Sequence, residues 1–284
     1  MFPLIGVGLL QVATTSAYDP DAQAVISAIE ATGVTLSPTQ KTACNNRILA
    51  HKADQTWAKL IGYYGFLGGT AASHAINWKS PGTYNLTYIG TISHSANGVQ
   101  ASGSGSAANT EYNFASAGLL TRSAHLACYS RTNIAETSCD MGALEYYPAF
   151  GSVKAMGLYL RWSTGELIYS GIDQIQFGIA ASTGATVAAH TFDSGSNGKA
   201  FRVIQSGSAI YTATITGVAS LTELNAPLYL MNRSNVNAPD PAAYDRVSSR
   251  QFGSFQFGYD FTQSEAIASS NSEQAYQTDL GRQV

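Results

Sequence analysis

The feature that most constrains the fold is an alternation of apolar and polar residues with a period of two. Met156, Leu158 and Leu160 are separated by single residues of other types, and segments 175–181 and 255–259 repeat the pattern. Successive side chains of a strand point to opposite faces, so this period predicts strands with one buried face. About ten such segments, without helical patterns between them, predict a two-sheet antiparallel sandwich rather than a parallel α/β fold.

Turn signals join several of these predicted strands. Asn97-Gly98 lies between TISHS and VQASG and predicts a hairpin with a type I′ turn. Gly207 marks a second turn between FRVIQ and IYTATI. We interpret the glycine-rich segment 103–108 (GSGSAA) as a loop inside the sandwich rather than a domain boundary.

Capping signals predict helices at both ends of the chain. Asp19-Pro20 predicts a first helix, whose apolar face would consist of Ala22, Val25, Ile26 and Ile29. The capping box Ser37–Gln40 predicts a second helix, whose stripe would consist of Leu49, Ala53, Trp57 and Leu60. These two would form a helical hairpin. A third capping box at Thr262 opens a C-terminal helix with Tyr276 as its main apolar anchor.

The expected fold class is therefore all-β, with an N-terminal helical hairpin and a C-terminal helix. We expect three parts: an apolar attachment segment 1–17, the hairpin and lead-in 18–80, and the sandwich with its C-terminal helix 81–284. Within the first part, an uncharged apolar run predicts an assembly contact made by Leu4, Ile5, Val7, Leu9 and Leu10. The alternative is simple disorder at the end of the chain.

Low charge excludes several classes of partner. Charged residues are 12% of the chain, where about 25% is usual. The net charge of −3 gives no basic field for phosphate, so we expect no nucleic-acid binding. Residues 4–13 are too few to span a bilayer, and no Lys or Arg precedes Lys41, so neither membrane insertion nor a signal peptide is expected.

A search for catalytic groups finds none. Hydrolysis of glycosides on a sandwich needs two carboxylates facing each other across a groove. The expected strands contain no such pair, and we interpret Asp140, Glu145, Asp240 and Asp245 as solvated loop acids. The serine-hydrolase, P-loop and zinc-protease motifs are also missing from the sequence. We therefore expect no catalytic residue and no enzyme activity.

Metal and cofactor sites are not expected either. Cys44, Cys128 and Cys139 have no metal spacing and predict small core residues, with a Cys128–Cys139 bridge as the alternative in an oxidising compartment. The five histidines are scattered singly, and only His94 and His125 fall on expected strands. Asp193 opens a segment like a calcium loop, but Ile204 stands where the bidentate Glu belongs. Calcium held by Asp193 and Asn197 stays the alternative to a polar turn.

Several segments together resemble a known family. The sequence GYYGFLGGTAASHAINW at residues 62–78 resembles an opening seen in bacteriophage virion proteins. SAHLACYSRTNI at 123–134, SNGKAFRVIQSGSAI at 196–210 and APLYLMNRSN at 226–235 resemble their concanavalin-like or laminin-G-like jelly roll. QTDLGR at 277–282 resembles the C-terminal segment that is usual in these proteins. The resemblance covers residues 18–284.

This resemblance implies a concanavalin-like jelly roll on a tailed-phage particle, as a fibre, spike-like or decoration protein. It implies a virion location, self-association such as a trimer, contacts with other virion proteins, and contact with a host surface glycan. No catalytic residue or cofactor carries over. If sugar or calcium binds, the residues to suspect are Asn197, Asn232 and Asn235. The rival hypotheses are a carbohydrate-binding module and, behind it, a polysaccharide depolymerase.

Overall fold

The computed structural model describes residues 18–117, 123–147, 152–163, 167–171, 173–177, 183–193, 198–215, 224–237 and 245–284. The helical elements are α1 (Pro20–Glu30), α2 (Pro38–Ala53), η1 (Trp57–Lys59), α3 (Ala71–His74), α4 (Phe114–Ala117) and α5 (Gln263–Asp279). The strands are β1 (Leu60–Tyr64), β2 (Thr87–Ser95), β3 (Gly98–Asn113), β4 (Ala124–Ser130), β5 (Met141–Tyr147), β6 (Ser152–Tyr159), β7 (Leu167–Gly171), β8 (Asp173–Phe177), β9 (Gly184–Asp193), β10 (Gly198–Gln205), β11 (Ser208–Ile215), β12 (Pro227–Leu230), β13 (Arg233–Val236) and β14 (Gln251–Tyr259).

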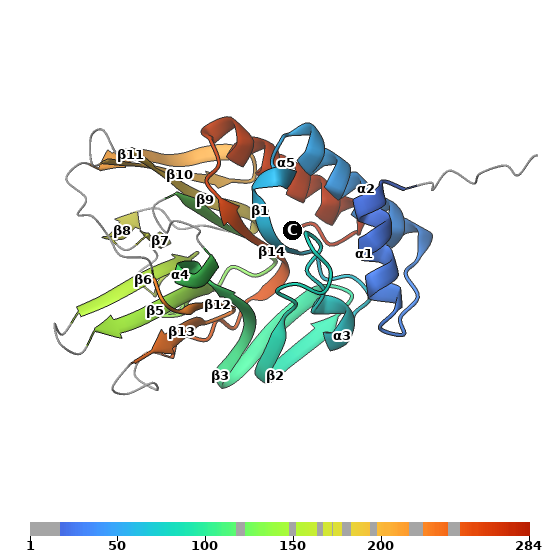
Figure 1. The fold of residues 1–284 in the computed structure, drawn as a ribbon, viewed down its shortest axis with the longest axis horizontal. Helices are drawn as coiled ribbons and strands as arrows, with labels where there is room; N and C mark the ends of the chain where they lie inside the picture. Colours follow the sequence, from blue (N-terminus) through green and yellow to red (C-terminus); the bar gives the residue numbers. More distant parts are fainter. Residues whose placement is uncertain are drawn as a thin grey trace, which may run out of the picture.

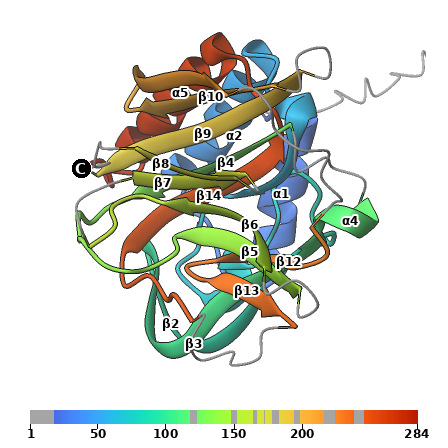
Figure 2. The same ribbon diagram turned by 90° about the vertical axis from the view of Figure 1, so that its left-hand side faces the viewer.

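The strands form one hydrogen-bonded sheet that curls over on itself (Figures 1 and 2). Its main order is β11-β10-β9-β4-β14-β3-β12-β5-β6-β7-β8, with β1 paired to β14, β2 to β3 and β13 to β5. Of the described pairs, only β13 with β5 is parallel. The chain is thus an antiparallel all-β sandwich with helices at both ends of its sequence, which confirms the expected fold class.

Strand β14 forms the corner between the two halves of the sheet. Its first residues, Gln251 and Phe252, pair with β3, whereas its later residues pair with β1, and β4 lies along its other side. The register shifts between Phe252 and Ser254. A Cβ on the residue between them, Gly253, would lie 2.7 Å from the Gln277 side-chain oxygen. Glycine therefore lets β14 bend at the point where it changes partners.

An apolar core fills the space between the two halves. Leu126 from β4, Leu158 from β6, Leu228 from β12 and Phe257 from β14 are all fully buried in it. The predicted strand at 255–259 is confirmed as part of β14, and Phe255 and Phe257 are buried in this core. The prediction of a single buried face is wrong, since Ser254 and Gln256 are buried as well and Tyr259 is 48% exposed.

Helices α1, α2 and α5 form a third layer behind the sheet in Figure 2, in which α5 packs against β9, β10 and β11 and α2 packs against α1 and α5. The predicted apolar face of α1, namely Ala22, Val25, Ile26 and Ile29, is buried there. The capping boxes at Ser37 and Thr262 are present, and Tyr276 of α5 is 2% exposed.

The predicted stripe of the second helix is wrong. Leu49 is 44% exposed and Ala53 is exposed, and α2 ends at Ala53, so Trp57 and Leu60 belong to η1 and β1. The buried face of α2 consists instead of Ala43, Cys44, Arg47, Ile48 and His51. A hydrophobic pattern could not indicate this face because two of its five members are polar.

Both predicted hairpins form, but one has a different turn. At Ser206-Gly207 the backbone has positive φ at both residues, as a type I′ turn requires. In the β2–β3 hairpin Ser95 pairs with Gly98, so Ala96 and Asn97 form the loop, and only Gly98 has positive φ (110°). The type I′ prediction at Asn97-Gly98 is therefore wrong. A Cβ at Gly98 would lie 2.0 Å from the Phe252 carbonyl oxygen, so glycine is required there.

The three cysteines are buried with free thiols, as the core interpretation predicted. No helix among the described residues is both long and apolar enough to cross a bilayer. The predicted assembly contact (Leu4, Ile5, Val7, Leu9 and Leu10) lies outside the described residues, as does the first part of the three-part division.

Candidate functional site

An open polar pocket of about 240 Å³ lies between β3 and the β12–β13 turn. Strands β3 and β13 are in the lower half of Figure 1. The residues that line it are Ser104, Gly105, Tyr229, Asn232, Arg233, Asn235 and Asp245. They come from three segments that are far apart in the sequence. The pocket offers an aromatic ring, a guanidinium, amides and a hydroxyl within one surface.

The glycine-rich segment forms one wall because it bulges out of β3. Ile89 pairs with Ala107 but Thr91 pairs with Ser102, so the four residues 103–106 of β3 face the single residue Gly90 of β2. Gly103 and Gly105 have φ of 81° and 75°, values that favour glycine. The segment was predicted to be a loop inside the sandwich, and it is a bulge within a strand.

Asp245 fixes this wall. Its carboxylate accepts hydrogen bonds from the Ser104 hydroxyl at 2.7 Å, the Gly105 N–H at 2.8 Å and the Asn232 side-chain amide at 2.7 Å. Burial alone would raise the pKa of Asp245, but these bonds to the ionised form outweigh it and the pKa lies below its ordinary value. Asp245, expected to be a solvated loop acid, is instead the anchor of the pocket.

Asn232 belongs to the scaffold as well. Its Nδ2 donates to the Ser106 carbonyl and to Asp245, and its Oδ1 accepts from the backbone N–H groups of Arg233 and Arg246. These contacts use both N–H groups and both lone pairs of the amide. Asn232 is 4% exposed. It therefore shapes the pocket and has no bonding capacity left for a ligand.

Tyr229, Arg233, Asn235 and Ser104 also line the pocket. Tyr229 is half-buried, and burial raises the pKa of its phenol, so the hydroxyl stays protonated at neutral pH. The Arg233 guanidinium donates to the Tyr159 hydroxyl at 3.2 Å, which orients it along the pocket. A ring with neutral donors and acceptors suits a ligand rich in hydroxyl groups.

The structure brings two of the three suspected binding residues together. Asn232 and Asn235, both suspected, line the same pocket. Asn197 and the predicted calcium turn lie outside the described residues apart from Asp193, whose side chain is also not described. Tyr229, Arg233 and Ser104 were missed, and the one signal for them was the GSGS run, which was interpreted as a loop. Calcium is not favoured at this pocket because Asp245 already accepts three hydrogen bonds.

The other suspected acids are structural. Asp140 is 1% exposed and Glu145 7%, so the solvated-loop prediction is wrong for both. Asp140 accepts from the Ser248 hydroxyl at 2.7 Å and lies 3.2 Å from Arg250 Nε. Burial raises its pKa although Arg250 opposes the shift. Glu145 accepts from the Asn225 N–H at 2.9 Å. Asp240 lies outside the described residues.

One pair of carboxylates does lie close together. Glu136 and Asp140 both accept a hydrogen bond from the Ser248 hydroxyl, and both face Arg250. Neither lines the pocket, where Asp245 is the one carboxylate among the described residues. Within the part of the chain that the structure describes, this site therefore lacks the two acids across a groove that glycoside hydrolysis needs.

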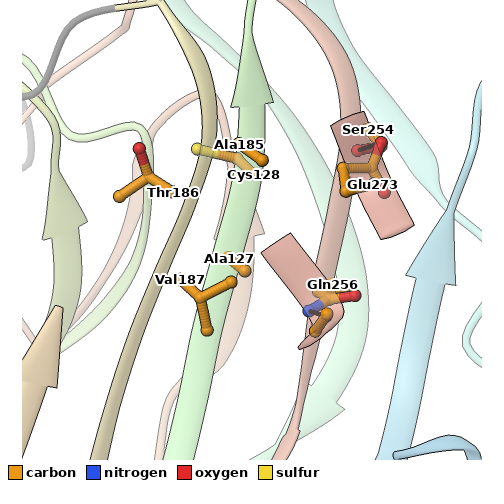
Figure 3. A pocket seen from close by; sticks show the side chains of 9 residues that line it. Ala127, Cys128, Ala185, Thr186, Val187, Ser254, Gln256 and Glu273 are labelled. Carbon is orange, nitrogen blue, oxygen red and sulfur yellow. Dashed lines mark hydrogen bonds between the residues drawn. The ribbon is translucent and has the colours of Figure 1, made fainter. Parts of the chain in front are cut away.

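A second cavity, beneath α5, is too small for a ligand. It measures about 10 Å³, roughly what one water molecule needs. Figure 3 shows Ser254 and Glu273 lying against each other on one side of it and Cys128 and Thr186 on the neighbouring strands. Among the described residues no cluster of three or more His, Cys, Asp or Glu could hold a metal ion.

No protein-family model and no curated protein matches this sequence. Among solved structures, the chain is similar to the CBM40 module of Ruminococcus gnavus IT-sialidase, with 13% identity, a TM-score of 0.43, and coverage of 66% of this chain and 100% of that one. It is also similar to Trypanosoma rangeli sialidase, with 13% identity, a TM-score of 0.49, and coverage of 77% of this chain and 33% of that one. A third similar structure is a legume lectin-like domain from Entamoeba histolytica, with 13% identity, a TM-score of 0.35, and coverage of 62% of this chain and 90% of that one.

These neighbours comprise a carbohydrate-binding module, a lectin-like domain and a sialidase, of whose length the chain spans a third. All three lie below 25% identity and below a TM-score of 0.5. The fold of this chain is accordingly taken from its own strand order, and its site from its own contacts.

Proposed function

We propose that the protein is a non-catalytic binding module that recognises a surface glycan through the pocket of Tyr229, Arg233 and Asn235. The observation that carries the proposal is that some residues of this pocket hold its shape while others face its opening. The side chains of Asp245 and Asn232 are hydrogen-bonded within the protein, whereas the half-buried ring of Tyr229 lines the open pocket together with amide and hydroxyl groups. Sugars are bound by stacking on such rings and by bonds to amides and hydroxyls.

The preformed wall supports this proposal. Three hydrogen bonds to Asp245 hold the bulge of β3 in place before any ligand arrives. A site that is already ordered loses less conformational entropy on binding. Among the described residues that line the pocket, Asp245 is the one carboxylate, whereas hydrolysis of glycosides needs two, and this supports binding rather than hydrolysis.

The test is binding to an array of bacterial polysaccharides and to α2,3- and α2,6-sialyllactose, the sugars bound in two Ruminococcus gnavus CBM40 structures. We expect Tyr229→Ala and Asn235→Ala each to weaken binding at least tenfold, with unchanged thermal stability. Tyr259→Ala is the matched control, since Tyr259 is an exposed tyrosine of β14 away from the pocket. If Tyr229→Ala and Asn235→Ala leave binding unchanged, the glycan binds elsewhere on the protein. If no glycan binds, the proposal is rejected.

A second candidate is a structural role in a tailed-phage particle, with the module displayed on the virion. It is favoured by the resemblance at 62–78 and 277–282, whose shared residues build the scaffold. Asn77 bridges the Tyr63 N–H and the Ile61 and Thr83 carbonyls, and Arg282 donates to the carbonyls of Gly65 and Phe66.

Mass spectrometry of purified particles tests this second candidate, and light scattering with and without residues 1–17 tests the self-association. A particle-associated protein whose oligomers need residues 1–17 is expected. A monomer that the truncation leaves unchanged, and that is missing from particles, would refute it.

A further inference from the structure

Two histidines that are 20 residues apart in the sequence lie together beside the β2–β3 hairpin. His74 ends α3 and His94 lies near the end of β2, and their Nδ1 atoms are 3.1 Å apart. Figure 1 places α3 beside β2. His74 is 1% exposed, whereas His94 is partly exposed. Neither residue lines the glycan pocket.

A third contact fixes where the protons are. The Gly69 N–H donates to His74 Nε2 at 3.1 Å, so this nitrogen carries a lone pair. A neutral imidazole has one N–H, so His74 has its proton on Nδ1 and donates it to His94 Nδ1. His94 Nδ1 is therefore the acceptor and Nε2 carries its proton. This arrangement of protons gives each of the facing nitrogens, and the Gly69 N–H, a hydrogen-bond partner.

This arrangement argues against a metal between the rings. A metal on His74 Nδ1 would move the proton to Nε2, where it would face the Gly69 N–H. No third ligand is present among the described residues either.

The surroundings disfavour positive charge on the pair. Tyr88 of β2 lies edge-on to His94 at 4.6 Å, Phe66 packs on His74 at 5.3 Å, and Val99 of β3 stands opposite His94. From the C-terminal segment, Arg282 donates to the Phe66 and Ala96 carbonyls and adds a fixed positive charge. No carboxylate of the described residues contributes to either histidine's pKa.

The pKa shifts agree with this geometry. Burial, then the charges of His94 and Arg282, lower the pKa of His74 to about 3. Burial lowers the pKa of His94. Both histidines are thus neutral in the closed structure. The pKa of each returns to about 6.5 when the side chain is exposed to water.

We propose that His74 and His94 form an acid-sensitive latch that holds the β2–β3 hairpin against α3 and the Gly68-Gly69 turn. A proton added to His94 Nδ1 places two N–H groups face to face at the present separation. His74 cannot turn its own proton away, because its Nε2 accepts from Gly69. The contact between α3 and β2 then becomes repulsive and the hairpin opens.

The latch connects to the pocket through the same hairpin. Beyond His94, β3 continues into the bulge at Gly103 and Gly105, and the Thr91 N–H donates to the Ser106 hydroxyl. Ser106 in turn accepts from Asn232 through its carbonyl. If the proposed function holds, acid opening of the hairpin displaces the pocket wall and releases the glycan.

The direction of the pH dependence follows from linkage. The closed state binds fewer protons than the open state below pH about 6.5, so opening becomes easier as pH falls. Each proton taken up contributes at most a tenfold change in the opening equilibrium per pH unit. Above pH about 6.5 the latch is closed and insensitive to pH.

Amide hydrogen exchange of the ligand-free protein tests the latch. After correction for the intrinsic effect of pH, protection of segment 87–102 should fall at least tenfold between pH 7 and pH 5. Segment 198–215, which has no histidine, is the internal reference for global unfolding and should change less.

Two variants make the test decisive. In His94→Asn the amide oxygen takes the place of Nδ1 as acceptor but does not titrate, so only His74 still takes up a proton on opening, and protection should fall clearly less from pH 7 to pH 5 than in the wild type. In His94→Leu the acceptor is lost, and protection of segment 87–102 should be low at both pH values. A wild type with constant protection, or a His94→Asn variant that follows the wild type, would overturn the latch.

The binding assay then separates this proposal from the previous one. Glycan affinity should fall from pH 7 to pH 5 in the wild type and fall clearly less in His94→Asn. If no glycan binds while the exchange result holds, the proposed function fails and the latch stands.

Discussion

The molecule has two interiors, both with an apolar core, but the one beneath the helices also contains a network of buried polar groups. Between the halves of the sheet the contacts are apolar, with Leu126, Leu158 and Phe257 in the centre. Between the sheet and the helices a buried charge pair lies among hydroxyls and amides: Arg47 of α2 is 3.0 Å from Glu273 of α5. The first interior depends on shape and volume, and the second on which atoms donate and accept.

The polar interior is a connected network. Glu273 accepts from the Tyr63 hydroxyl, the Ser254 hydroxyl and the Gln277 amide as well as pairing with Arg47. Such networks are stable when every member is satisfied and costly when one partner is removed. The helix layer should therefore be the more sensitive of the two interiors to a change of single atoms.

Removing the charge at the centre of the network should have the largest effect. Glu273→Ala leaves Arg47 as an unpaired buried charge and should cost about 3–5 kcal/mol of unfolding free energy, measured by urea denaturation. The double variant Arg47→Met/Glu273→Leu should recover a large part of this loss, since it removes both charges. Equal losses in the single and double variants would show that the charge pair is not what matters there.

Acid should act on the helix layer next. His125 donates from Nδ1 to the Tyr259 carbonyl and stacks on Phe261 at 3.8 Å, and its Nε2 has no partner among the described residues. Burial, the largest influence, lowers its pKa to about 4. Since the folded pKa lies below the unfolded value of about 6.5, stability is complete above pH 6.5 and is lost as pH falls to about 4.

For His125 alone this loss is about 3 kcal/mol, and His51, whose pKa burial also lowers, adds to it. Urea denaturation at pH 7, 5.5 and 4.5 measures the effect. Replacing His125 with Gln should flatten the pH dependence. A stability that is constant between pH 7 and pH 4.5 would contradict the assignment of neutral buried histidines.

A matched pair of conservative substitutions should show the smallest effects and the clearest contrast. Gln256→Met removes a bond to the Ser269 hydroxyl and one from Arg47, and should cost about 1–3 kcal/mol. Leu158→Met, a similar change in volume within the apolar core, should cost less than about 1.5 kcal/mol. Thermal denaturation of both compares them directly, and equal costs would mean that the two interiors do not differ in kind.

The same contrast explains what could be predicted from the sequence. Capping boxes are local, so Ser37 and Thr262 indicated their helices correctly. Alternation indicated strands because their buried face is apolar. The face of α2 was missed because Arg47 and His51 are buried in a polar network that hydropathy does not reveal.

The pocket could be predicted only in part, because it forms from distant segments. Ser104 and Asp245 are 141 residues apart and meet through a single hydrogen bond. The family resemblance indicated Asn232 and Asn235, but only the contacts show that the Asn232 amide is fully hydrogen-bonded within the protein and that Asn235 lines the pocket. The histidine pair was missed for the same reason, since each residue is isolated in the sequence.

The corner strand β14 has a consequence for the order of folding. It pairs with β1, which begins at Leu60, with β4 and with β3, yet it starts only at Gln251. The two halves of the sheet therefore stay unjoined at this corner until nearly the whole chain has been synthesised. Contacts of such long range are made slowly. During that interval the faces of β1 and β4 are uncovered, and it is then that the nascent chain is most prone to aggregate.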